Sequence, residues 1–287
     1  MRTPSNTWAA AGMIVVLAGC VAVARQERPA SAPGVPQVPQ APAALDPAID
    51  KILSRLESRK VHDLSAKVTW RSRSPLEQES DARVKLGTIK YKDFDPVPKF
   101  RVEFDKRISN RTVRPIEETH VFDGRWYVEV HGPPQKTVHR REIRRASDPL
   151  NPFKLGEKGA FPLPFGQKKE DILREFEVTR NPSLAGLGEK EAQAPPKTDH
   201  IRLTPRADTA SARSYNWVDF WIAQDGPLKG LPVKVLTAKK DATGRLNAYV
   251  TITFDEVKLD TGFSGNVFDI EAPRGYHEET EPLPPLP

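Results

Sequence analysis

The chain has few of the residues from which most metal sites and many catalytic sites are built. Its 287 residues include one cysteine, Cys20, and six histidines. A single cysteine excludes an intramolecular disulfide and a cysteine-rich metal site. The histidines form no closely spaced ligand pair in the sequence. We therefore predict no metal site, and we expect no cofactor.

The sequence also lacks the motifs of the common enzyme classes. It contains no Gly-x-Ser-x-Gly elbow, no glycine-rich phosphate loop and no His-Glu-x-x-His. Cys20 lies in a segment that we expect to direct export, so it is not a candidate nucleophile. The sequence thus offers no catalytic residue, and we predict that the protein is not an enzyme.

An apolar run near the N-terminus, Thr7–Ala24, is typical of a signal peptide and too short to indicate a transmembrane span. We expect residues 1–24 to direct export to the periplasm or cell envelope. The core of this run ends in Leu17-Ala-Gly-Cys20, which is similar to the bacterial lipobox. That similarity implies cleavage before Cys20 and a lipid anchor on its thiol. Ala22-Val-Ala24 is a competing cleavage site that would remove the cysteine.

The charge balance is mildly basic, with a net charge of +6 and a pI near 9.3. Such a balance favours anionic partners. The densest basic cluster, His139–Arg145, could contact an anionic membrane surface. Alternatively, it is a solvated edge strand whose charges prevent edge-to-edge pairing. Because export is expected, we predict no nucleic-acid partner, and we expect a monomer.

Composition divides the rest of the chain into three parts. Residues 25–45 are rich in proline and alanine and are typical of a linker. Residues 46–276 carry the signals of a folded domain, which opens with Asp46 as a helix N-cap and Pro47 at the first helical position. We expect this helix to end near Lys60. Residues 277–287 form an acidic, proline-rich tail that we predict to be disordered.

The strongest strand signal lies at residues 246–254. Leu246, Ala248, Val250, Ile252 and Phe254 alternate with polar or amphipathic residues, which is the period of a strand with one covered face. After Phe254 the apolar residues move to odd positions. A slip of one residue reverses the faces, so either a β-bulge lies at residues 255–256 or the strand ends there.

Similar alternating segments recur along the domain and predict nine or ten strands. Asp123-Gly124, between two of them, indicates a tight hairpin turn. Residues 168–176 read as a short helix, and Pro182–Pro196 as a polar, mobile excursion. We therefore predict a mainly β (α+β) fold, in which a curved antiparallel sheet forms an incomplete β-barrel covered by a few helices.

Apolar side chains on these strands could fill a core or line a cavity for a ligand, and alternation does not distinguish the two. The candidate cavity residues are Val68, Trp70, Val84, Leu86, Phe100, Val102, Phe104, Phe122, Trp126, Val218, Phe220, Ile222, Val250, Ile252 and Phe254. A loop interrupted by prolines supplies three further apolar residues, Phe161, Leu163 and Phe165. We consider these three as candidates for a lid or a membrane contact.

The order of several short segments resembles the outer-membrane lipoprotein carrier and sorting family, the LolA/LolB-like proteins. The segments are the helix at 46–60 leading into Ala66–Trp70, Gly87–Tyr91 followed by Lys99–Val102, Phe122–Trp126, Val250–Asp260 and Phe268–Tyr276. The resemblance implies an incomplete barrel with a helical lid, a cavity for acyl chains, no cofactor and no catalysis. The soluble carrier of that family has no lipobox, so Cys20 fits a membrane-anchored relative better.

The leading functional hypothesis is therefore an exported carrier that binds lipid acyl chains or lipoproteins. A sensing or scaffold module of the same fold, which binds a protein partner, is the alternative. A hydrolase of envelope substrates is a third hypothesis, although the sequence shows no nucleophile–base pair.

Overall fold

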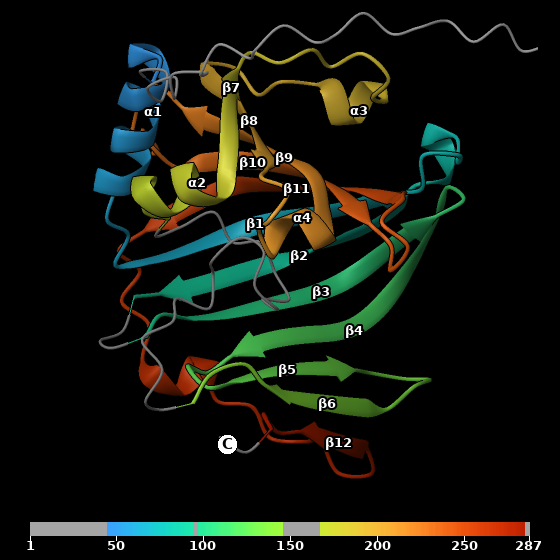
Figure 1. Cartoon of the computed structure of the whole chain (residues 1–287). Helices are drawn as coiled ribbons and strands as arrows, with labels where there is room; N and C mark the ends of the chain where they lie inside the picture. Colours follow the sequence, from blue (N-terminus) through green and yellow to red (C-terminus); the bar gives the residue numbers. More distant parts are fainter. Residues whose placement is uncertain (1–44, 94–96, 146–166, 285–287) are drawn as a thin grey trace, which may run out of the picture. The chain divides into compact units, whose positions relative to one another are not determined.

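The computed structural model describes residues 45–93, 97–145 and 167–284 (Figure 1). Within them, twelve strands form one curved sheet in the order β12-β6-β5-β4-β3-β2-β1-β11-β10-β9-β8-β7. The first and last strands of this order do not pair, so the sheet stays open. This confirms the predicted class, a mainly β fold with an incomplete barrel and few helices.

The sheet consists of two meanders that meet where β1 pairs antiparallel with β11. The first meander contains β1 (Asp63–Arg73), β2 (Arg83–Lys92), β3 (Lys99–Ser109), β4 (Thr112–Phe122), β5 (Trp126–His131) and β6 (Thr137–Glu142). The second contains β7 (Phe176–Arg180), β8 (Thr198–Pro205), β9 (Tyr215–Ala223), β10 (Pro232–Lys240) and β11 (Leu246–Leu259).

The register assigns each strand residue to one of two faces, because residues directly opposite each other share a face. The inner face carries Val68, which pairs with Phe254 and Gly87. The outer face carries Arg71, which pairs with Thr251 and Val84. Every other strand residue follows from these pairs by alternation, apart from the bulges.

Helix α1 (Pro47–Ser58) packs its apolar stripe into the same core as the inner face. Ile49, Ile52, Leu53 and Leu56 are all buried there. The Asp46 side chain accepts a hydrogen bond from the Ala48 N–H, as the N-cap prediction requires. Helix α2 (Lys169–Glu175) contacts α1 and β7 (Figure 1). The described helices of this face therefore lie toward the β7 end of the sheet.

The outer face of β5 and β6 has a separate small core. Val128, Val130 and Val138 are buried there against Ile270 and other apolar residues of the C-terminal segment. The turn η2 (Gly265–Phe268) precedes this segment and contacts β3. The chain thus crosses the outer face of the first meander before it reaches the sheet edge.

Two irregularities interrupt the register of the sheet, the first at the position that the sequence indicates. The register between β1 and β11 shifts at residues 255–258, and Glu256 has a positive φ of 49°. The alternatives for residues 255–256 are therefore resolved in favour of a bulge, and β11 continues to Leu259. A second shift lies at Gly87, where β2 pairs with β3.

One prediction about local structure was wrong. Residues 277–281 form β12 (His277–Glu281), which pairs parallel with β6, instead of belonging to a disordered tail. The predicted short helix at residues 168–176 is confirmed as α2 (Lys169–Glu175), and Phe176 begins β7. The polar excursion at residues 182–196 includes α3 (Glu189–Ala192), which buried polar contacts hold against the sheet.

None of the helices in the described residues is long and apolar enough to cross a membrane.

Candidate functional site

Most of the candidate cavity residues lie together on the inner face and belong to one apolar cluster, with Trp70 packed at its border. Twelve of the fifteen do so: Val68, Trp70, Phe100, Val102, Phe104, Phe122, Val218, Phe220, Ile222, Val250, Ile252 and Phe254. The register therefore brings residues from both meanders onto one continuous apolar surface.

The other three candidates were assigned to the wrong face. Val84 and Leu86 pair with Arg71 and Thr69, so they lie on the outer face. Lys85, between them, points inward beside Trp70. Trp126 packs against the small outer core of β5 and β6. A strand has two faces, and an alternating sequence does not say which of them is covered by helices.

The half of the inner face beneath α1 is a filled core. Val218, Phe220, Ile222 and Leu53 have no measurable exposure. An apolar gap beside Leu64 and Phe254 has a volume of about 10 Å³. A gap of that size holds at most about one water molecule. The protein's own side chains therefore fill the described part of the inner face beneath α1.

The other half of the inner face carries an apolar strip across β1–β4. We define the apolar strip as Val68, Ile89, Phe100, Val102, Phe104 and Phe122, all buried. The rings of Phe100 and Phe122 stack with their centroids 6.1 Å apart. The strip is continuous with the core beneath α1, because both belong to the same cluster.

A basic pocket of about 590 Å³ adjoins one end of the apolar strip. Its residues come from β1–β4 and from the turn between β3 and β4: Trp70, Ser72, Arg83, Lys85, Arg107, Ser109, Asn110, Thr112 and Arg114. The strand residues of this set share the inner face. Four of the nine side chains are cationic, and none is a carboxylate.

Glu118 lies between the basic pocket and a polar region farther along the inner face. Its carboxylate is 2.5 Å from Lys85 Nζ, 3.8 Å from Arg107 Nη2 and 2.7 Å from His120 Nε2. Burial alone would raise the pKa of Glu118, but hydrogen bonds from His120 and Lys85 outweigh it and lower the pKa to about 2. Glu118 is therefore an anion throughout the neutral range.

The lowered pKa of Glu118 makes its contribution to stability depend on acid. Between pH 4.5 and 2 the unfolded chain binds this proton and the folded protein does not, so unfolding becomes easier as the pH falls. In the wild type, this effect should lower the free energy of unfolding by about 2 kcal/mol, after allowance for solvent screening. Glu118→Gln cannot bind the proton and should not show this loss. Urea denaturation at pH 7, 4.5 and 2.5 measures it, with the exposed neighbour Glu117→Gln as control. Parallel acid losses in Glu118→Gln and wild type would contradict the assignment.

Three histidines extend the polar region across β4, β5 and β6. The rings of His120 and His131 are 6.4 Å apart, and those of His131 and His139 are 6.2 Å apart. His131 and His139 line a second hollow with Tyr127, Glu129 and Glu279. His120 is hydrogen-bonded to the Tyr127 hydroxyl at 2.7 Å. No group of three or more histidine, cysteine or acidic side chains is placed to bind a metal within the described ranges.

The basic cluster His139–Arg145 is not a solvated edge strand. β12 lies along β6, and its acidic side chains face the cluster: Arg140 pairs with Glu278, and His139 lies 3.0 Å from Glu279. Arg125 from the β4–β5 turn pairs with Glu142 at 2.8 Å. The acidic C-terminal segment therefore offsets part of the charge that we predicted for a membrane surface.

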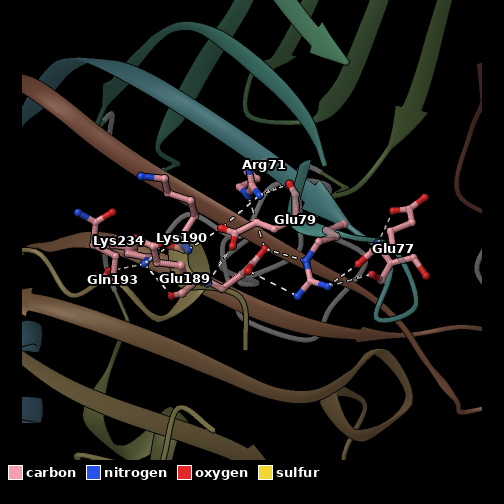
Figure 2. A network of polar contacts seen from close by, with 10 residues as sticks. Arg71, Glu77, Glu79, Glu189, Lys190, Gln193 and Lys234 are labelled. Atoms are coloured by element: carbon pink, nitrogen blue, oxygen red, sulfur yellow. Dashed lines mark hydrogen bonds and ion pairs between the residues drawn. The ribbon is translucent and has the colours of Figure 1, made fainter. Parts of the chain in front are cut away.

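A buried polar network on the outer face holds α3 against the sheet (Figure 2). Glu191, 1% exposed, lies 3.2 Å from Arg73 Nε and 3.5 Å from Arg71 Nε. Lys234, 2% exposed, donates hydrogen bonds of 2.6–3.0 Å to the carbonyls of Lys190, Glu191 and Gln193. Burial lowers the pKa of Lys234 to about 8. Its ion pairs and its Lys234 hydrogen bonds all join groups of the chain itself, which marks the network as structural.

The remaining candidates lie outside the described residues. These are Cys20, the proposed lipid attachment site, and the loop residues Phe161, Leu163 and Phe165. Their roles stay predictions.

No family model and no curated protein matches the chain. Three solved structures are similar over 77% of it. They are a DUF1329 family protein from Desulfovibrio piger (13% identity, 96% of that chain, TM-score 0.39), a LolA superfamily protein from Nitrosomonas europaea (11%, 97%, 0.37) and a domain named for outer membrane lipoprotein sorting from Vibrio parahaemolyticus (12%, 94%, 0.32). Two of these names agree with the predicted LolA-like fold. At such TM-scores the similarity carries no functional weight, and the fold rests on strand order and register.

Proposed function

We propose that this protein is an exported carrier that binds the acyl chains of lipids or lipoproteins on the inner face of its sheet. The observation that supports the proposal is the apolar strip, which continues the core across β1–β4. Each chain methylene removed from water contributes about 0.8 kcal/mol, so a chain could bind there without any catalytic group.

The geometry restricts where the chain would lie. Beneath α1 the core is filled by the protein's own side chains, so an acyl chain would have to displace them. The β1–β4 half has the basic pocket at the end of the strip, with the half-buried Trp70 at the border between the two. We therefore place the acyl chain along the strip, with one end near Trp70. The strip is itself buried, so the chain would have to displace the groups that cover it. Export and a lipid anchor on Cys20 belong to the same proposal and stay predictions from the sequence.

A neutral amphiphile with a photoreactive acyl chain tests this proposal. We expect irradiation to attach it to peptides from β2, β3 and β4, and we expect Trp70→Ala to reduce labelling about tenfold, because Trp70 loses apolar contact with the chain. Mass spectrometry of digested protein measures both the site and the yield.

Trp126→Ala is the matched control, because Trp126 is a half-buried tryptophan of the same sheet on the outer face. Its labelling should equal that of the wild type. The proposal is wrong if the chain does not label the protein, or if labelling maps to the outer face around Trp126.

A further inference from the structure

The basic pocket places cationic side chains opposite each other on neighbouring strands, where their repulsion opposes strand pairing. Lys85, Arg107 and Arg114 lie opposite one another on β2, β3 and β4, in the row that begins at Trp70. Like charges directly opposite each other on neighbouring strands destabilise a sheet. The fourth cation, Arg83, lines the same pocket one row nearer the strand ends.

The carboxylates of the protein neutralise this row incompletely. Glu118 serves both Lys85 and Arg107, and Glu77 lies 3.7 Å from Arg83. Arg114 is exposed and has no ion pair with any acidic residue in the part of the chain that the structure describes. Four cations thus face two carboxylates. The remaining net charge of +2 would be neutralised by one further anion of up to two negative charges.

The uncharged residues of the pocket suit an oxyanion. Ser72, Ser109 and Thr112 carry hydroxyl groups, and Asn110 carries an amide. Ser109 and Thr112 lie opposite each other because Asn110 and Arg111 form a two-residue turn with φ of 49° and 62°. Guanidinium groups and hydroxyls together are the donors that bind phosphate in proteins.

The basic pocket lies next to apolar side chains, so its ligand should also have an apolar part. Lys85 Nζ lies 5.0 Å from the ring centroid of Trp70 and 5.6 Å from that of Phe104. Phe104 belongs to the apolar strip, so the pocket and the strip share a border. A ligand that fills both would carry an anionic head and an apolar chain.

From this geometry we infer that the basic pocket binds the phosphate group of an amphiphile whose chain lies along the apolar strip. The inference rests on the proposed function for the chain, and it adds the headgroup class and the residues that recognise it. Arg114 and Arg107 contact the phosphate, and Lys85, held by Glu118, supports them.

Calorimetric titrations of the full chain with three probes test the inference at one fixed ionic strength, because charge–charge contributions depend on salt. The probes are dodecyl phosphate and dodecyl maltoside, each below its micelle concentration, and inorganic phosphate. We expect dodecyl phosphate to bind at least tenfold more tightly than either of the others. Arg114→Gln should weaken dodecyl phosphate binding about tenfold, as expected for the loss of one charge-assisted hydrogen bond, and should leave dodecyl maltoside binding unchanged.

Lys106→Gln is the matched control, because Lys106 is exposed on the outer face of β3 and its loss changes the net charge equally. It should alter dodecyl phosphate binding less than twofold. Arg83→Gln provides a second pocket variant, and circular dichroism confirms that each variant is folded. Arg114→Gln is not expected to unfold the protein, because it relieves repulsion within the row.

The outcomes separate the two proposals. Equal binding of dodecyl phosphate and dodecyl maltoside, or equal effects of Arg114→Gln and Lys106→Gln, would overturn the headgroup site and leave the acyl-chain function standing. Inorganic phosphate binding as tightly as dodecyl phosphate would also overturn it, in favour of a site for free phosphate. If neither amphiphile binds, the proposed function fails as well.

Discussion

Replacing Glu191 with glutamine is expected to lower the free energy of unfolding by about 3–5 kcal/mol. Glu191 is 1% exposed and is the carboxylate that lies between Arg71 and Arg73. Glutamine preserves the size of the side chain but removes its charge. Arg73, 6% exposed, would then face a neutral amide, while Arg71 would keep its ion pair with Glu79 at 3.5 Å. Removing one partner from a buried ion pair costs much more than the pair itself contributes.

The same substitution should loosen α3, because the backbone of Lys190, Glu191 and Gln193 supplies the acceptors for Lys234. Urea denaturation measures the global effect, and limited proteolysis within residues 181–197 measures the local one. Glu189→Gln is the control, since Glu189 lies in the same short helix and its side chain is exposed. A loss below about 1 kcal/mol for Glu191→Gln would show that the network is solvated and contributes little.

Gly87→Ala should lower the free energy of unfolding nearly as much as Glu191→Gln, for a steric reason. A Cβ there would lie 1.9 Å from the carbonyl oxygen of Glu103 and 2.8 Å from the Cα of Phe104, both backbone atoms of β3. Backbone atoms in a paired strand cannot rotate away, so β2 and β3 would have to separate. We expect Gly87→Ala to cost roughly 3 kcal/mol or more.

Gly265→Ala is a suitable control for Gly87→Ala, because a Cβ at Gly265 meets no atom within 4 Å and its φ is not positive. Thermal and urea unfolding of both variants give the comparison. The separation of β2 from β3 should also spread the apolar strip and weaken amphiphile binding in the folded fraction. A Gly87→Ala protein as stable as Gly265→Ala would mean that the register of β2 and β3 differs from the one described.

Local signals made several parts of the fold predictable from the sequence. Asp46 and Pro47 mark the start of α1, and Asp123-Gly124 marks the turn between β4 and β5, where Asp123 Oδ1 accepts hydrogen bonds from the Arg125 and Trp126 N–H groups. The change of phase after Phe254 correctly indicated an irregularity. Each of these signals depends on residues next to one another in the chain.

The errors concern relations between strands, which local patterns do not contain. Val84 and Leu86 alternate with polar residues in the same way as Ile89 and Tyr91, but they lie on the opposite face. Nothing in the short acidic run of β12 indicates that β6 is its partner. The basic pocket could not be predicted, because Lys85, Arg107 and Arg114 become neighbours only through the register of three strands.

The pairing of β1 with β11 has a consequence for how the chain reaches its native state. Each meander is built from hairpins whose partners are close in sequence, so each can assemble locally and early. The seam between β1 and β11 joins residues from opposite ends of the domain, and the loop-closure entropy opposes it until both meanders exist. We expect the seam to form last. Until it does, the facing edges of β1 and β11 are unpaired and can pair with another chain.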